Sequence, residues 1–387
     1  TDAFKPVMLK KQGAIGQKVV AEARNHVALG AIPTEQVQPM SGEWWVSHTP
    51  DLTYVSQMSL PGAYDAANFV NKITGDDRAQ TKLYSGNDDD ANRYYNQMKA
   101  YLDGGIRAFD LKLSYSEDES KYPGHWYTNR VANFTASPEA VNFTQFVAAG
   151  IKWLQAHTTE FLLVFLSDYE AGSSTKGTDN YVNHASDLIN LIPEQYLLKS
   201  FGPDITVGEA RGKILVVNGT PVNNPIGLTV TGWEHNNRNE RTQPNEVALR
   251  NYTMGSGKIY VHDYNNLRSN ESDWTKKHTL LANAFASCKG DTDVSHWYYI
   301  GACARHWAVL NDVVYSDAMD GSAPKGGIRK DVYDWVKSLS NGEKYERAGI
   351  VMMAYVCNGA KFNGETVEDA IWANNYKGDG APLAPRQ

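Results

Sequence analysis

Several short apolar runs of this 387-residue chain end in polar or ionisable side chains. The residues whose chemistry is of interest are Tyr64, Asp65, Asp110, Lys112, His125, Asp168 and Asp263. A lysine offsets the negative charge that develops on a phosphoryl group in its transition state, and a histidine can protonate a leaving oxygen. Brought to one place, an aspartate, a lysine and a histidine indicate a site that binds or transfers a phosphoryl group.

Each of these residues also has an ordinary structural explanation. An aspartate that follows a strand, such as Asp65, is often a helix N-cap, and a histidine beside a tryptophan, such as His125, often packs at the surface. Asp110 and Lys112 alternate on one predicted strand and therefore point to the same face. His262 precedes Asp263, so we expect it to point the other way and to pack against a helix. The combination, rather than any single residue, indicates a site.

The elements that must position these residues are short strands that alternate with amphipathic stretches. Eight strands are predicted, at 53–60, 105–113, 121–127, 160–168, 212–218, 257–264, 295–302 and 348–356. Helices are predicted at 91–103, 142–157, 181–192, 273–286 and 329–339. This alternation favours parallel βαβ units and an α/β fold.

Eight parallel strands are also the number that closes a TIM-type (β/α) barrel. An open doubly wound sheet is the alternative, and it would need a phosphate-binding fingerprint such as G-x-G-x-x-G, which is absent. In a barrel the active site lies at the carboxyl ends of the strands, where the polar residues above would meet. We expect the barrel over residues 44–380, an N-terminal extension over 1–43 with a short helix in QKVVAEARNHVALGA, and a tail over 381–387.

The composition excludes several classes of partner. The net charge is −7, and no lysine or arginine cluster is longer than three residues, which argues against nucleic acid. No apolar run is long enough for a transmembrane helix, so any membrane contact is expected to be peripheral. Three cysteines, Cys288, Cys303 and Cys357, cannot all pair within the chain. No Cys/His spacing resembles a zinc site, and the first residue, Thr1, suggests a processed chain.

From about Trp45 to Tyr376 the sequence resembles the X-domain barrel of the phosphatidylinositol-specific phospholipases C, most closely the small, metal-independent bacterial enzymes. SLPGAYDAANF resembles the first-strand motif S-I-P-G-T-H-D-S, and GGIRAFDLKL resembles G-A-R-x-F-D-I-R. The stretches GEWWVSHTPD, EFLLVFLSDYE, ARGKILVVN, IYVHDY, AGIVMMAYV and VEDAIWANN resemble, in order, the lead-in, the fourth, fifth, sixth and eighth strands and the closing helix.

The resemblance implies an intramolecular phosphoryl transfer that needs no cofactor. In that family a base histidine, oriented by an aspartate, activates the inositol 2-hydroxyl, an arginine stabilises the phosphorus centre, and a second histidine protonates the leaving diacylglycerol oxygen. By resemblance, His125 matches the acid, Lys112 the arginine and Asp65 the acidic residue beside the base. Asp110 matches the acid of the F-D-I-R motif and Asp263 an acid that contacts inositol hydroxyls. Asp168, at the end of the fourth strand, is a further substrate-binding candidate.

Two positions depart from the family pattern. Tyr64 replaces the base histidine, and Ala354 replaces the aspartate that orients it. The paired loss is physically consistent, because a buried carboxylate without its imidazole partner would be unsatisfied. Two hypotheses follow: a phosphodiester lyase or hydrolase with altered base chemistry, in which Tyr64 takes part, and a non-catalytic barrel that binds a sugar, an inositol phosphate or another anion.

The expected partner is a small molecule or a lipid headgroup. Lys112 and the pair Tyr64-Asp65 stand where the calcium-using relatives place acids and an asparagine, so a calcium site is not supported and no metal is expected. The resemblance also implies a protein that is secreted or held at the cell envelope of a bacterium.

Overall fold

The structure is a computed structural model. It describes residues 40–64, 66, 90–120, 122–128, 141–168, 178–220, 222–233, 248–264, 266–267, 271–306, 319–320, 327–339, 346–354, 356–357 and 359–376. The chain divides into two compact units, Thr1–Pro39 and Met40–Gln387, and every described residue belongs to the second. The helix expected within residues 1–43 and the tail expected over 381–387 lie outside the described residues.

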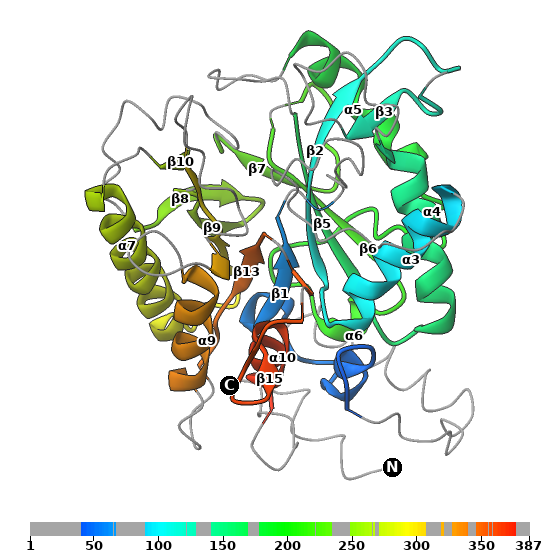
Figure 1. The fold of residues 1–387 in the computed structure, drawn as a ribbon. Coiled ribbons are helices and arrows are strands. Elements are labelled where there is room, and N and C mark those ends of the chain that lie inside the picture. Colours follow the sequence, from blue (N-terminus) through cyan, green and yellow to red (C-terminus); the bar gives the residue numbers. More distant parts are fainter. Residues whose placement is uncertain are drawn as a thin grey trace, which may run out of the picture. The chain divides into compact units, whose positions relative to one another are not determined.

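Nine strands of the described part close into a barrel (Figure 1). In barrel order they are β1 (Leu60–Ala63), β13 (Ile350–Met353), β11 (His296–Ala302), β9 (Gly257–His262), β8 (Arg250–Met254), β7 (Leu228–Thr231), β6 (Ile214–Asn218), β5 (Leu162–Asp168) and β2 (Ala108–Tyr115), which pairs with β1 again. Eight of them are parallel, and β8 runs antiparallel to both of its neighbours. The prediction of a TIM-type barrel is confirmed, in an irregular form.

The strand predicted at 121–127 is not a barrel strand, and that prediction was wrong. The segment forms β3 (Trp126–Thr128), which runs antiparallel to β2 and continues to β4 (Val141–Asn142) outside the barrel. Gly124 and His125 have φ angles of 77° and 67°, and this left-handed pair reverses the chain. The short link from β2 leaves no room for the helical crossover that a parallel neighbour requires.

Two barrel strands, β7 and β8, were not predicted. The first four residues of β8 alternate between partly exposed and exposed positions and only Met254 is buried, so this strand lacks the continuous apolar run of its parallel neighbours. The first predicted strand, at 53–60, begins only at Leu60, because Val55–Gln57 form a 3₁₀ turn, η2. The strands of the barrel centre are simpler to predict, since every residue of β5 and β6 is buried.

The predicted helices are present with small shifts of their ends. They are α3 (Asp90–Asp103), α4 (Phe143–Ala156), α5 (Asp179–Asn190), α7 (Glu271–Gly290) and α9 (Ile328–Leu339), with the shorter α6 (Val207–Ala210), α10 (Val367–Ala373) and the 3₁₀ helix η1 (Trp45–His48). Two small strand pairs complete the described part: β10 (Asn266–Leu267) with β12 (Arg305–His306), and β14 (Lys361–Phe362) with β15 (Glu365–Thr366).

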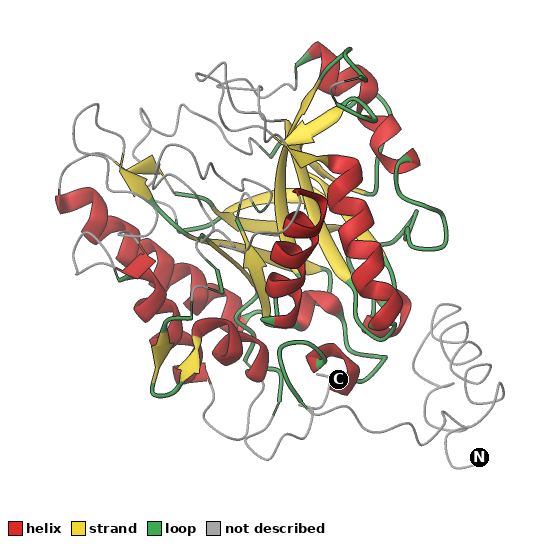
Figure 2. Ribbon diagram, turned by 45° about the vertical axis from the view of Figure 1, so that its right-hand side comes forward, coloured by secondary structure: helices red, strands yellow, loops and turns green. Residues whose placement is uncertain are grey.

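The helices cover the barrel from outside (Figures 1 and 2). Helices α3 and α4 lie side by side against one side of the strands, and α7 and α9 lie together on the opposite side. Among the described residues no helix is both long and apolar enough to cross a membrane.

Candidate functional site

The carboxyl ends of β1, β2, β5, β9, β11 and β13 meet at one rim of the barrel. The strand register fixes which side chains share the interior face there: Asp110 lies opposite Phe165, and Lys112 lies opposite Ser167 on the neighbouring strand β5. Tyr299 reaches the same face from β11, because its hydroxyl contacts Asp110 across the barrel. This interior face is the candidate site.

The centre of the site is a buried ion pair between Lys112 and Asp110. The Lys112 Nζ donates to Asp110 Oδ2 at 2.7 Å, and both side chains are at most 3% exposed. Tyr299 adds a second donor to the same carboxylate oxygen, at 3.3 Å. The lysine charge is therefore largely offset inside the protein before any ligand arrives. A phosphate at this position has to share Lys112 with Asp110.

Tyr64 lies directly against the same lysine. The Lys112 Nζ is 3.9 Å from the centroid of the Tyr64 ring, within the range of a cation–π contact. Tyr64 is 8% exposed and follows β1, where its backbone N–H donates to Met353 O. Ala354, the next residue of the β13 segment, is fully buried and offers no carboxylate. The tyrosine thus presents its ring face, rather than only its hydroxyl, to the cation.

Aromatic rings and a second acid complete the interior face. The Tyr299 ring packs edge-on against Trp233 and Phe165, with centroids 5.2 and 5.3 Å apart. Burial raises the pKa of Tyr299 well above its ordinary value, and the charges of Asp110 and Asp263 raise it further. Tyr299 is therefore a neutral hydroxyl at physiological pH. Asp263, just beyond β9, is partly exposed.

Ser167 is a site residue that the sequence analysis did not identify. It is fully buried beside Lys112, and its Oγ has no hydrogen-bond partner in the part of the chain that the structure describes. A buried hydroxyl without a partner costs free energy unless a ligand or water satisfies it. The alternation of β5 predicts which face Ser167 occupies, but the sequence alone does not show that the hydroxyl lacks a partner.

His125 lies farther out, in the turn that leads to β3. Its Nδ1 is 2.9 Å from Ser116 O, and because a carbonyl oxygen only accepts, Nδ1 carries the proton. The ring stacks on Tyr115, and Nε2 is 3.9 Å from Glu119 Oε2. Ser116 stands four residues beyond Lys112, which is about 13 Å along an extended strand. In the described residues His125 makes no contact with Lys112 or Tyr64.

The remaining predicted residues are placed as follows. Asp168 pairs with Leu113 in the register and so lies on the opposite face of the strands from Lys112. Its Oδ2 accepts from the backbone N–H of Thr178 at 2.6 Å, at the residue that caps α5. Asp65 lies outside the described residues. The structure therefore brings Tyr64, Asp110 and Lys112 together, with Asp263 on the same face, and leaves Asp168 and His125 apart from them.

His262 faces outward, and that prediction is confirmed. Its Nδ1 donates to Ala248 O at 2.8 Å, and its Nε2 is 3.0 Å from the buried Lys277 Nζ on α7. Burial and the nearby Lys277 charge lower the pKa of His262 well below its ordinary value. A neutral imidazole that accepts from a lysine on a packed helix has a structural role.

Chemically, the interior face offers acceptors at Asp110 and Asp263, a neutral donor at Tyr299 and a hydroxyl at Ser167. Such an assortment suits the several hydroxyl groups of a polyol, and aromatic rings suit its apolar ring face. The face has a single offset cation and no imidazole among the described residues.

No protein-family model matches the chain, and no curated protein does. Solved structures are similar. A Staphylococcus aureus phosphatidylinositol-specific phospholipase C with a single histidine-to-tyrosine substitution matches with a TM-score of 0.57 and 17% identity, over 87% of this chain and 97% of that chain. The Listeria monocytogenes phosphatidylinositol-specific phospholipase C gives a TM-score of 0.55 and 16% identity, over 87% and 99%. These likenesses show a shared TIM-type barrel fold.

Another structure of the Staphylococcus aureus enzyme, from a study of how its membrane binding is modulated, gives a TM-score of 0.59 and 16% identity. It covers 87% of this chain and 98% of that chain. The chain therefore has a phospholipase C-like barrel over most of its length.

Proposed function

We propose that the rim of this phospholipase C-like barrel binds the polyol headgroup of a phosphodiester such as phosphatidylinositol, and that it cleaves the diester slowly or not at all by the family's base mechanism. The observation that carries this proposal is the contact of the Tyr64 ring with Lys112, beside the buried Ala354. A base and its orienting acid are both replaced, while the polar groups suited to hydroxyls remain.

The expected loss of rate on replacing a histidine base by tyrosine follows from the pKa values of the two side chains. An unperturbed tyrosine has a pKa near 10 and a histidine one near 6.5, so at neutral pH about one tyrosine in a thousand is deprotonated. A positioned general base contributes about 10²- to 10⁴-fold to the rate. Lys112 contacts the tyrosine ring face and is already paired with Asp110, so it does little to favour a tyrosinate.

Binding needs less than catalysis. Asp110 and Asp263 accept from substrate hydroxyls, Ser167 gains the partner that it lacks, and Lys112 meets the phosphate as a point charge. Asp65 adjoins Tyr64 in sequence and is proposed as a supporting acid.

The second candidate is an active phosphodiester lyase or hydrolase in which His125 is the proton donor. The position of His125 supports this candidate, because Nδ1 donates to Ser116 O and the ring, 33% exposed, can take up a proton at Nε2 and donate it from there. In this reading Tyr64, close to Lys112, would act as the base.

The two candidates are separated by incubating the protein with phosphatidylinositol vesicles and with a soluble inositol phosphodiester, and by following cyclic phosphate with ³¹P NMR. Binding of the soluble diester is measured in parallel by calorimetry. We expect binding, with little or no cyclic phosphate. The double variant Tyr64→His/Ala354→Asp restores the base and its partner, and should raise turnover by about 10²-fold or more.

Turnover by the parent protein that disappears in His125→Ala would replace the binding proposal with the lyase. Binding without turnover in the parent, with gain of turnover in the double variant, supports the proposal. If neither protein binds or cleaves either diester, the substrate class is wrong.

The same proposal includes a cellular setting. A protein that acts on a lipid headgroup works at a membrane surface, so we propose peripheral membrane contact and a secreted or envelope location in a bacterium. Retention on phosphatidylinositol vesicles, compared with phosphatidylcholine vesicles in a sedimentation assay, tests the membrane part.

A further inference from the structure

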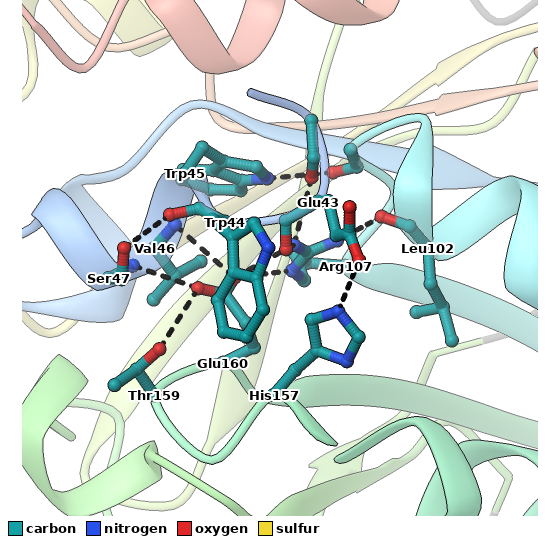
Figure 3. Close-up of polar contacts among 12 residues, drawn as sticks. Glu43, Trp44, Trp45, Val46, Ser47, Leu102, Arg107, His157, Thr159 and Glu160 are labelled. Atoms are coloured by element: carbon teal, nitrogen blue, oxygen red, sulfur yellow. Dashed lines mark hydrogen bonds and ion pairs between the residues drawn. The ribbon is translucent and has the colours of Figure 1, made fainter. Parts of the chain in front are cut away.

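A second cluster of ionisable side chains lies at the opposite end of the barrel, where β2 and β5 begin. Figure 3 shows two of its members, Glu43 and His157. Glu43, Asp103 and His157 come from three distant parts of the chain: the segment before η1, the last residue of α3 and the residue after α4. One donor atom from each lies within 4.8 Å of the others. We propose that these three residues bind a divalent transition-metal cation, of which Zn²⁺ is the representative.

The hydrogen bonds of His157 leave its Nε2 facing the carboxylates. Its Nδ1 is 2.8 Å from Trp153 O, and a carbonyl only accepts, so Nδ1 carries the proton. The Nε2 lies 2.8 Å from Glu43 Oε1, and a carboxylate oxygen only accepts as well. A neutral imidazole and a carboxylate have no hydrogen bond to share at this distance. The contact therefore requires a positive charge on the pair, and a metal ion bound to both groups meets that need once Nε2 and Oε1 move apart from 2.8 Å, which is closer than two ligands of a tetrahedral ion stand.

The surroundings resemble the second shell of a metal site. Histidine ligands usually donate their other N–H to a backbone carbonyl, and carboxylate ligands are themselves hydrogen-bonded. Here one residue does both, because Trp153 accepts from His157 through its carbonyl and donates through its indole Nε1 to Asp103 Oδ1 at 2.9 Å. The His157 ring also lies between two indoles. It stacks on Trp153, with ring centroids 3.9 Å apart, and is tilted against Trp44, with centroids 4.3 Å apart.

The donor set decides the kind of cation. Imidazole favours Zn²⁺ and related transition metals over Mg²⁺ or Ca²⁺, and two carboxylates add the charge that balances a dication. Ligand bonds in zinc sites are about 2.0–2.2 Å, so ligands on either side of the ion lie at most about 4.4 Å apart. The three donor atoms already lie within 4.8 Å of one another, and small rotations can bring them to ligand distance because the side chains of Glu43 and Asp103 are 38% and 30% exposed. Their exposure also gives the ion a path to the site.

Lys99 competes with a metal ion for the carboxylate of Asp103. Its Nζ is paired with Asp103 Oδ2, four residues along α3, and it is 43% exposed, so it can move aside. The hydrogen bond and the charge of Asp103 raise the pKa of Lys99, together with the charge of Glu43. A metal has to displace this ammonium or share the carboxylate with it. Removing the lysine charge should therefore strengthen metal binding.

A bound metal ion would link the segment before η1 to helices α3 and α4. Glu43 precedes η1, which the buried Arg107 and Glu160 already hold: Arg107 Nη2 donates to the Gly42 and Glu43 carbonyls, and Glu160 accepts from the backbone of Ser47 (Figure 3). A metal shared by Glu43, Asp103 and His157 would join that segment to both α3 and α4. The expected role is structural, far from the carboxyl-end rim.

The test uses the full chain, stripped with a chelator and titrated with Zn²⁺ alone by calorimetry, with Co²⁺ visible absorption as a second readout. We expect one ion per chain and a higher thermal midpoint in its presence. Glu43→Gln keeps the shape of the side chain, and His157→Phe keeps the stack between the indoles; each should weaken Zn²⁺ binding at least tenfold. Lys99→Met should tighten it.

The matched control is His184→Phe. His184 also stacks on an aromatic ring, Tyr115, and lies 3.8 Å from Asp187, and the described part of the chain offers no third ligand there. This variant should bind Zn²⁺ as the parent does. The proposal is overturned if the parent binds no Zn²⁺, which would leave a protonated His157 as the positive species. It is also overturned if Glu43→Gln and His157→Phe bind Zn²⁺ as tightly as the parent.

Discussion

Replacing Ser167 by alanine should stabilise the free protein and at the same time weaken its binding of a headgroup. Ser167 is fully buried on the interior face beside Lys112, and its hydroxyl has no partner among the described residues. A buried polar group without a partner keeps its desolvation cost, whereas an apolar replacement of similar shape removes it. The two effects have opposite signs because the ligand supplies the partner that the protein does not.

The expected magnitudes follow from ordinary hydrogen-bond energies. An unsatisfied buried hydroxyl costs about 1–3 kcal/mol, so Ser167→Ala should raise the free energy of unfolding by about 1 kcal/mol, with 3 kcal/mol as the upper end. A hydrogen bond to the ligand contributes about 0.5–1.5 kcal/mol, so binding of an inositol phosphodiester should weaken about 2- to 12-fold.

Ser59→Ala is the matched control. Ser59 is equally buried, but its Oγ accepts from Ala348 N and from Asn374 Nδ2, both at 2.9 Å. Alanine at this position leaves two hydrogen-bond donors without their acceptor. It should therefore lower the free energy of unfolding by about 1–3 kcal/mol and leave the affinity for the inositol phosphodiester unchanged.

Both variants are compared with the parent by denaturant unfolding and by calorimetric titration. If Ser167→Ala destabilises the protein as much as Ser59→Ala does, the hydroxyl has a partner within the fold and the reasoning fails. If stability rises but affinity does not change, the ligand does not reach this side chain.

Two further predictions concern stability. Glu160→Gln leaves the buried Arg107 guanidinium, 2.8 Å away, without its carboxylate, and should cost about 3–5 kcal/mol in denaturant unfolding. Combined with Arg107→Met it should cost less than the sum of the two single variants, and an additive double variant would argue against a coupled pair. The pKa of His262 is lowered by burial and by Lys277, so the unfolded chain takes up a proton near pH 6.5 and the folded one does not. This contribution leaves stability full above about pH 6.5 and lowers it as the pH falls below that value, by at most about 1.4 kcal/mol per pH unit. His262→Gln should flatten that slope, and an unchanged slope would mean that other groups control it.

The sequence alone was sufficient for the class of fold and for the faces of the strands that it predicted correctly, although it missed β7 and β8 and wrongly counted the segment at 121–127 as a barrel strand. The apolar runs of β5 and β6 are buried on both sides, and this pattern is readable without a structure. The two-residue period of a strand placed Asp110 and Lys112 on one face, and it directed His262 outward toward α7.

What a residue meets across the barrel depends on which strands become neighbours, and only the tertiary structure decided that. In the structure a left-handed turn at Gly124 and His125 reverses the chain, so the segment at 121–127 forms a hairpin with β2. The same turn brings His125 to within hydrogen-bond distance of Ser116 O. The tertiary structure also paired Lys112 with Asp110 and Tyr299, and left the hydroxyl of Ser167 without a partner among the described residues.

At the other end of the barrel, the structure gathered Glu43, Asp103 and His157 from positions that no local spacing connects. The physical reason is the same at both ends. A strand or helix pattern encodes which side of an element is buried, while the identity of the partner is set by closure of the barrel and by the packing of helices that are distant in sequence.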